Sequence, residues 1–230
     1  MIIDLHTHTT PGSPDSLIRP RQLVEVAKRA GLDGVCITEH GNSKAEGIDE
    51  LARECNFLVL GGFEATTELG DILVFGVDSC PGNITRAAEL RRFVVEAGGV
   101  MIAAHPFRNY ITRRIYTTPG NTLTIEKACS LEIFRLVDAI EVANGWSTEE
   151  DVIFTQEVSN RLALKGTGGS DAHLPTQIGC CVTIFENTIR TERDLVAELK
   201  GGRFQAADRR GMAQKNPAQW FYSNENRLDP

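Results

Sequence analysis

Short apolar runs alternate along this chain with segments of helical periodicity, and a histidine or an acid follows almost every run. The clearest examples are the runs at 33–38 and 57–60, which lead into Glu39-His40 and Phe63-Glu64. Strands that alternate with helices of about 10–15 residues are typical of parallel βα units. The loops after such strands meet at one mouth, where barrel enzymes carry their chemistry. The pattern therefore predicts an α/β fold with a polar site at that mouth.

The first of these sites is Asp4-Leu5-His6-Thr7-His8, close to the amino terminus. Side chains alternate along a strand, so we expect Asp4, His6 and His8 to share one face. Two imidazoles about 7 Å apart on that face can bind one cation. An edge strand with two solvated histidines is the alternative, but the rest of the histidine inventory argues against it. The other three histidines also end apolar runs: His40, His105 and His173.

The size and charge of the chain narrow the possible functions. With 230 residues it can bury one sizeable core. Its formal charge is −7, which argues against binding duplex nucleic acid through the overall field. The six cysteines contain no C-x-x-C pair, and neither a signal peptide nor a long apolar run is recognisable. We therefore expect a cytoplasmic protein without a membrane segment, and the oligomeric state is left open.

Apolar periodicity and capping residues give the expected elements. Strands are predicted after the first at 33–38, 57–60, 71–77, 100–104, 139–143, 163–165 and 181–184. Helices are predicted from Pro20, from Ser43 with Glu46 as a capping box, and at 84–97, 125–136, 148–161 and 191–200. From Asp208 onward the pattern is lost.

Acidic motifs accompany the histidines in a fixed order. They are Asp15, I-T-E-H at 37–40, F-E at 63–64, H-P at 105–106 and G-G-S-D-A-H at 168–173. Together with D-L-H-T-H they resemble the PHP (polymerase and histidinol phosphatase) family of metal-dependent phosphoesterases, over residues 1–206. Within the family the chain looks closest to the small stand-alone enzymes that act on nucleotide-like substrates. Their opening loop usually reads S-D-G-x-x-x-P; here it is Pro14-Asp15-Ser16, although Pro20 keeps the same distance from the acid.

The resemblance implies a distorted (β/α)7 barrel over 1–206, followed by a C-terminal extension, 207–230, that packs on the barrel or trails from it. It also implies two or three divalent ions of Mn, Zn or Fe at the C-terminal mouth of the strands. The implied ligands are His6, His8, Glu64 and Asp171 for one ion, Glu64 and His105 for a second, and Asp15, His40 and His173 for a third. The family often has one more histidine between His105 and Asp171. This chain has none there, and Glu141 or Asn144 are the possible replacements.

Other residues are expected to support these ligands or to bind the substrate. Asp4 and Glu39 are placed to accept hydrogen bonds from histidine N–H groups or to relay a proton. Arg108 and Arg113 lie in an irregular segment after His105. Because the forked donors of arginine suit phosphate oxygens, Arg108 is the candidate clamp for a substrate phosphate. Ser170 could bind a phosphate oxygen or shape the turn before Asp171.

Taken together, the motifs predict a metal-dependent phosphoesterase in which a metal-activated water attacks a small phosphorylated substrate, a nucleotide mono- or bisphosphate being the leading candidate. Three alternatives stay open. The first is an exonuclease or phosphodiesterase that trims short oligonucleotides, for which the basic, aromatic stretch at 107–116 is the only hint. The second is a histidinol phosphate phosphatase. The third is a non-catalytic metal-binding regulatory module.

Overall fold

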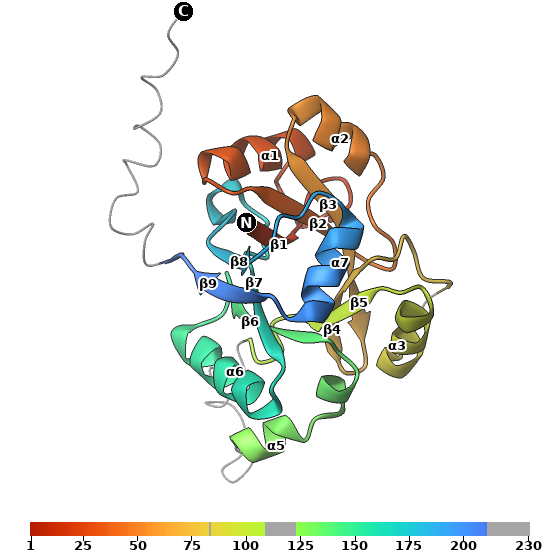
Figure 1. The fold of residues 1–230 in the computed structure, drawn as a ribbon, viewed down its shortest axis with the longest axis vertical. Coiled ribbons are helices and arrows are strands. Elements are labelled where there is room, and N and C mark those ends of the chain that lie inside the picture. The colour runs from red at the N-terminus through yellow and green to blue at the C-terminus, as the bar shows by residue number, and fades with distance from the viewer. Residues whose placement is uncertain (83, 109–122, 211–230) are drawn as a thin grey trace, which may run out of the picture.

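The computed structural model describes residues 1–82, 84–108 and 123–210, which build one mixed sheet with helices around it (Figure 1). The strands are β1 (Ile2–Thr7), β2 (Gly34–His40), β3 (Leu58–Thr67), β4 (Gly70–Phe75), β5 (Val100–Ala103), β6 (Ala139–Asn144), β7 (Lys165–Gly169), β8 (Cys181–Phe185) and β9 (Phe204–Asp208). The helices are α1 (Pro20–Arg29), α2 (Ile48–Cys55), α3 (Ala87–Glu96), α5 (Ile125–Cys129), α6 (Glu149–Leu162) and α7 (Glu192–Gly201). No helix in these described ranges is long and apolar enough to cross a membrane.

The sheet curls into a nearly closed barrel. Its strand order is β7-β6-β5-β4-β3-β2-β1-β8-β9, and only β4 and β8 run antiparallel to both of their neighbours. The end of β7 returns to the end of β1, where the Asp171 N–H donates to the His6 carbonyl (2.7 Å) and the His8 N–H to the Ala172 carbonyl (3.1 Å). The expected α/β barrel is therefore confirmed. The implied count of seven is not, because the sheet of the described chain has nine strands.

A close approach of β7 to β8 completes this closure. A Cβ atom on Gly168 would lie 2.4 Å from the Val182 carbonyl oxygen, so no larger residue fits without moving one of the strands. The buried hydroxyl of Thr183 accepts from the Gly168 N–H (2.9 Å) and donates to its carbonyl (2.8 Å). One threonine side chain thus stands in for two ladder hydrogen bonds.

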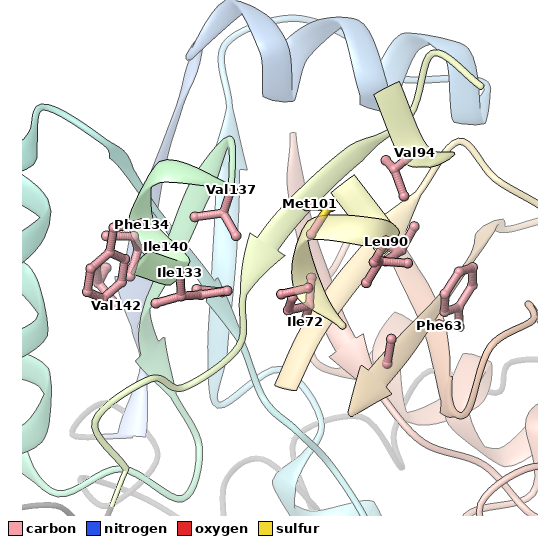
Figure 2. Packing of buried hydrophobic residues seen from close by; sticks show 14 of the residues in the cluster. Phe63, Ile72, Leu90, Val94, Met101, Ile133, Phe134, Val137, Ile140 and Val142 are labelled. Atoms are coloured by element: carbon pink, nitrogen blue, oxygen red, sulfur yellow. The ribbon is translucent and has the colours of Figure 1, made fainter. Parts of the chain in front are cut away.

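Three apolar clusters hold the barrel. The interior cluster joins inward side chains such as Leu5, Leu60 and Leu73 to Leu195 and Leu199 of α7, which closes the end of the barrel opposite the mouth. The two other clusters lie outside the sheet. One lies under α1 and α2; the other lies under α3, α5 and α6 and is shown in part in Figure 2, where Leu90 and Val94 of α3 lie beside Met101 and Ile72 of the sheet.

Most predicted elements are present, with differences at their ends. The helices predicted to start at Thr148 and Thr191 are present, and in the structure each threonine is the N-cap residue of a capping box. Three predictions were wrong. Ser43 does not cap a helix, because α2 begins only after Gly47, which adopts a left-handed conformation. The helix predicted at 125–136 ends at Cys129 and is followed by a 3-10 turn, and the strand predicted at 163–165 begins only at Lys165.

The last strand was not predicted at all. β9 runs through residue 206, the expected end of the barrel, to Asp208, and pairs with β8 along its whole length. Of the expected C-terminal extension, residues 211–230 lie outside the described residues, as does Arg113. Directly after β9, the Arg209 N–H donates to the Cys180 carbonyl at 2.7 Å.

The register of β1 separates Asp4 from the histidines. Between Asp4 and Thr7 the pairing with β2 shifts, since three steps along β1 match two along β2. Such a shift reverses the alternation of side chains beyond it. His6 therefore turns toward Glu64 inside the barrel, whereas the Asp4 carboxylate binds the Gly179 N–H behind the strand. The prediction that Asp4 shares a face with His6 and His8 was wrong.

We predict that Thr183→Val lowers the free energy of unfolding by about 2 kcal/mol, because it keeps the side-chain shape but leaves the buried N–H and carbonyl of Gly168 unpaired. Urea denaturation measures the change. Thr167→Val is the matched control, since the Thr167 hydroxyl makes one longer hydrogen bond, of 3.4 Å, to the Ile140 carbonyl. Equal losses in the two variants would contradict the role given to Thr183 in closing the barrel.

Candidate metal centre

The predicted ligands meet at the mouth of the barrel, although they come from distant parts of the chain. His6 is the last residue but one of β1, His40 ends β2 and Glu64 lies in β3. His105 follows β5 and Asp171 follows β7. The carboxyl ends of these parallel strands bring their side chains together. Three groups have donor atoms within 4.8 Å of one another, as a shared metal ion requires: His8, His40 and His173; His6, His8 and Asp171; and His6, Glu64 and His105.

Glu64 is the centre of the inner cluster. Its Oε1 lies 3.0 Å from His105 Nε2. Its Oε2 lies 2.9 Å from His40 Nδ1 and 3.4 Å from Nε2 of both His6 and His8. One buried carboxylate thus faces four imidazoles, which is the geometry expected of a bridging ligand.

Asp171 closes the cluster from the opposite side. Its Oδ1 lies 3.2 Å from His8 Nε2 and 3.5 Å from His6 Nε2. Its Oδ2 accepts a short hydrogen bond from Arg108. The predicted first group, consisting of His6, His8, Glu64 and Asp171, is therefore assembled in one place.

The third predicted group lies nearer to solvent. Asp15, on the loop after β1, has its Oδ2 3.3 Å from His40 Nε2 and 3.2 Å from His173 Nε2. The Asp15 side chain is 59% exposed, whereas His6 and His8 are fully buried. The outer group is thus the open side of the centre.

The inner cluster has the donor set and the unpaired atoms that a divalent ion needs. His6 Nε2, His8 Nε2 and Glu64 Oε2 are buried, and within the described structure none of them makes an aligned hydrogen bond, although His40 Nδ1 lies 2.9 Å from Glu64 Oε2 and Asp171 Oδ1 lies 3.2 Å from His8 Nε2. Buried polar atoms are rarely left unpaired, and these three point at one another. Mixed imidazole and carboxylate ligands suit Mn, Fe or Zn. The residues present therefore fit a divalent metal ion.

The electrostatics of the cluster favour a positive charge. Burial opposes protonation of His6, but the charges of Asp171, Glu141 and Glu64 outweigh it and hold the pKa of His6 well above its usual range. Burial lowers the pKa of His8 to about 4, which keeps the ring neutral, as a metal ligand must be. Burial would also raise the pKa of Glu64, yet His6, His105 and His40 hold that pKa well below its usual range.

Glu141 and Asn144, the two candidates for the missing ligand, contact other candidate ligands. Glu141 Oε1 lies 3.0 Å from His6 Nδ1, and its Oε2 accepts from the His105 N–H (2.9 Å) and from Asn144 Nδ2 (3.0 Å). Asn144 Oδ1 accepts from the Trp146 N–H at 2.9 Å. Gly169 makes this possible, since a Cβ there would lie 2.6 Å from Glu141 Oε1. As placed, Glu141 orients the His6 ring so that Nε2 faces the cluster.

Asp4 and Glu39 also support the ligands, but not through the contacts predicted. The Asp4 carboxylate accepts backbone N–H groups of Ser170 and Gly179, both at 2.9 Å, and so fixes the turn before Asp171. Burial raises the pKa of Asp4 to about 6. Glu39 accepts the hydroxyl of Ser13, whose oxygen lies 3.1 Å from His8 Nδ1. Glu39 therefore acts on the ring of His8 indirectly, through the hydroxyl of Ser13.

Two of the four described non-glycine residues with positive φ are candidate ligands, and the other two, Asn56 and Ala163, end helices. His105 has φ of +29° and Asp171 has φ of +52°, in the left-handed region that residues other than glycine rarely adopt. Such conformations persist where the surrounding structure enforces them, and they cluster at functional sites. Here the His105 N–H is held by Glu141, and the Asp171 N–H by the His6 carbonyl.

The predicted substrate-binding residues divide into two kinds. Arg108 is partly exposed at the mouth and donates to Asp171. Ser170 is fully buried, and its hydroxyl donates to the His6 carbonyl at 3.3 Å. That placement favours a role in the turn over contact with a substrate, because the hydroxyl faces backbone rather than the opening.

The cavity at the mouth has walls that sequence reasoning missed. It measures about 510 Å³ and is lined, besides Arg108 and the ligands, by Thr66, Asp71 and Trp146. The indole N–H of Trp146 donates to the Asp171 carbonyl (2.8 Å), and its exposed ring lies edge-on to His173. The position of Trp146, two residues after the end of β6, is the signal that could have identified it. Asp71 was predicted only as the first residue of the strand at 71–77, with no part in the site.

Comparisons with known proteins give a consistent result. A model of the PHP domain matches residues 4–90, and a PHP-associated model matches residues 155–204. The chain is 30% identical over 159 residues to the uncharacterized protein MJ1587 of Methanocaldococcus jannaschii, a match that covers 64% of this chain and 83% of that protein.

Two solved structures share the fold. PsfC of Pseudomonas syringae superposes with a TM-score of 0.61 at 22% identity, over 94% of this chain and 96% of that one. A two-domain protein of Bacteroides vulgatus, described as containing a predicted PHP-like metal-dependent phosphoesterase, gives a TM-score of 0.66 at 21% identity. That match covers 90% of this chain and 64% of the other.

We predict that Glu141→Gln weakens binding of Mn²⁺ by about 10- to 100-fold, as is usual when a partner of a ligand is lost. If the new amide nitrogen faces His6 Nδ1, the ring proton moves to Nε2, the atom aimed at the cluster. If it faces the other way, it opposes the N–H groups of His105 and Asn144. Isothermal titration calorimetry measures the affinity. Glu96→Gln, at an exposed position of α3, is the control, and an unchanged affinity in folded Glu141→Gln would contradict the assignment.

Proposed function

The chain belongs to the PHP family, and from this premise we propose that it hydrolyses the phosphate ester of a small molecule in a metal-dependent reaction. The observation that carries the proposal is the inner cluster, in which three buried imidazole and carboxylate atoms face one another without an aligned hydrogen bond to any described residue. They belong to His6, His8 and Glu64. We propose Mn, Zn or Fe as the metal, held by the ligands predicted from the sequence, with Glu141 as a positioning residue rather than a ligand.

The residues of the chain prepare this reaction in several ways. When bound, divalent ions supply charge neutralisation for the transferring phosphoryl group and acidify the attacking water. Glu141 fixes the ring of His6, and Ser13 with Glu39 fixes that of His8. Asp4 holds the turn that carries Asp171.

Arg108 is the proposed clamp for the substrate phosphate. It lies at the cavity wall with its guanidinium on Asp171 Oδ2, one of the proposed metal ligands. A phosphate bound beside the ligands would therefore be within reach of the same guanidinium, whose forked donors match two phosphate oxygens.

The cavity supports a small substrate, and its wall supports a nucleotide as the candidate. A volume of about 510 Å³ is in the range of small-molecule sites. The exposed indole of Trp146 offers an apolar face on which a planar base could stack. The basic, aromatic stretch that suggested an oligonucleotide substrate falls largely in 109–122, outside the described residues.

We predict that the protein loaded with Mn²⁺ releases phosphate from at least one member of a panel, and that EDTA abolishes the release. The panel contains p-nitrophenyl phosphate, histidinol phosphate, nucleoside 5′-monophosphates, nucleoside 3′,5′-bisphosphates and a short oligonucleotide. Asp171→Asn should lower the rate by about 100-fold or more, because it removes a charge from the cluster while keeping the side-chain shape.

Asp78→Asn, an exposed position away from the mouth, controls for the change of charge. Thermal melting followed by circular dichroism establishes that each variant is folded. The member of the panel that turns over best separates the nucleotide proposal from the histidinol phosphate and oligonucleotide alternatives. No turnover with Mn, Zn or Fe, despite metal bound to a folded protein, would overturn the proposal in favour of a regulatory module.

We further predict that Arg108→Ala lowers kcat/KM for the best substrate by about 10- to 100-fold through loss of a charge-assisted hydrogen bond. Arg108→Lys should lose less, because the charge remains but the fork does not. Metal affinity should be equal or higher in Arg108→Ala, since a cation next to Asp171 is removed. Arg92→Ala, at an exposed position of α3, is the control, and a weaker metal affinity in Arg108→Ala would contradict the role.

A further inference from the structure

The cavity at the mouth has two chemically different sides. One side consists of the proposed metal ligands, from β1, β2, β3 and β7 and the loops that follow them. The other side consists of Asp71 at the start of β4, Arg108 after β5 and Trp146 after β6. Because these strands are neighbours in the sheet, the three side chains form one continuous wall. A second cavity of about 250 Å³ shares Asp71 and Arg108 with the first and extends it past Pro106.

The register of the β3–β4 hairpin turns Asp71 into the mouth. Thr66 pairs with Asp71, and Glu64 pairs with Leu73. Since alternate residues share a face, Asp71 lies on the same face as Leu73 and Glu64, about 7 Å farther out along the strand. Leu73 packs in the barrel interior, which fixes the direction of that face. The Asp71 carboxylate is thus one step outside the metal centre.

Asp71 has acceptor capacity to spare. The Thr66 hydroxyl donates to its Oδ1 at 2.9 Å, and within the described structure this is the only side chain that hydrogen-bonds the carboxylate. A carboxylate can accept about four hydrogen bonds. Asp71 also belongs to none of the groups of described residues whose donor atoms could share a metal ion. Its remaining acceptor sites face the cavity.

The charge of this wall is unsuited to a second phosphate. Among the described lining residues of both cavities, Arg108 is the only lysine or arginine, and the substrate phosphate next to the ligands would engage it. A second phosphate on the same molecule would then lie near Asp71, with no further lysine or arginine among the described lining residues to pair with it. Like charges so close repel, whereas a hydroxyl or amino group there gains a charge-assisted hydrogen bond.

We propose that Asp71, held by Thr66, determines substrate specificity: it selects phosphate monoesters whose leaving group carries a hydroxyl or amino donor, and it rejects molecules with a second phosphate. The inference rests on the proposed function and narrows its substrate class. It places the departing part of the substrate on the wall formed by Asp71, Arg108 and Trp146.

The test uses Asp71→Asn, which keeps the shape and the acceptor for Thr66 but removes the charge. With the Mn²⁺-loaded protein, p-nitrophenyl phosphate serves as the reporter substrate, and the other phosphates are measured as competitive inhibitors of its hydrolysis. Two matched pairs are compared: isopropyl phosphate with glycerol 2-phosphate, which adds two hydroxyl groups, and a nucleoside 5′-monophosphate with its 3′,5′-bisphosphate.

We expect the wild-type protein to bind glycerol 2-phosphate more tightly than isopropyl phosphate, and the monophosphate more tightly than the bisphosphate. Asp71→Asn should shift the bisphosphate-to-monophosphate affinity ratio about tenfold toward the bisphosphate and should reduce the preference for glycerol 2-phosphate. Turnover of p-nitrophenyl phosphate, whose leaving group has no donor, is measured in both proteins so that each ratio comes from an active, metal-loaded enzyme. Asp78→Asn carries the same loss of charge outside the mouth and should change neither ratio.

Two failures are distinguishable. If both ratios stay unchanged in Asp71→Asn while the reporter is hydrolysed normally, the role of Asp71 is wrong and the proposed function stands. If the folded, metal-loaded wild-type protein does not hydrolyse the reporter or any member of the phosphate panel, the proposed function is wrong and the inference falls with it.

Discussion

The burial of two carboxylates among imidazoles at the barrel mouth is the constraint on which the rest of the structure depends. Glu64 and Asp171 are almost fully buried, and each has at least three histidines within 4 Å. A buried anion must be matched by positive charge. In the protein alone, Arg108 donates to Asp171, and the carboxylates favour a proton on His6 by holding its pKa well above its usual range. Divalent ions would replace that proton with greater charge. The charges of the site therefore favour a bound cation, whatever reaction the site catalyses.

Keeping such a cluster in place requires a closed sheet, because its members come from strands that lie far apart in the strand order. His6 belongs to β1 and Asp171 follows β7, and the two are joined directly by the Asp171 N–H and the His6 carbonyl. Gly168 allows β7 to approach β8 closely, and Gly169 leaves the space in which His6 and Glu141 contact each other. The same two glycines thus serve the fold on one side of the strand and the site on the other, so the closure of the barrel and the geometry of the ligands depend on each other.

Much of this arrangement can be predicted from the sequence. Strand-end positions are enough to bring His40, Glu64 and His105 to one mouth, since parallel βα units place the carboxyl ends of their strands together. The prediction that side chains alternate between the two faces of a strand was wrong where the strands are irregular. The register of β1 shifts after Asp4 and that of β6 after Glu141. These shifts depend on contacts with neighbouring strands, so the local sequence pattern does not predict them. Positive φ at His105 and Asp171 likewise arises from tertiary hydrogen bonds.

The missed residues have a related cause. Trp146 and Asp71 belong to no ligand motif, and they reach the cavity only because β4, β5 and β6 are neighbours in the folded sheet. Sequence order hides this, since 75 residues separate the two positions. The motifs that identify the family describe the side of the cavity that holds the ligands. The opposite side, formed by Asp71, Arg108 and Trp146, contains none of the proposed metal ligands. Differences in substrate among barrels with the same metal centre should therefore be sought on that wall, where Asp71 sets the charge and Trp146 the shape.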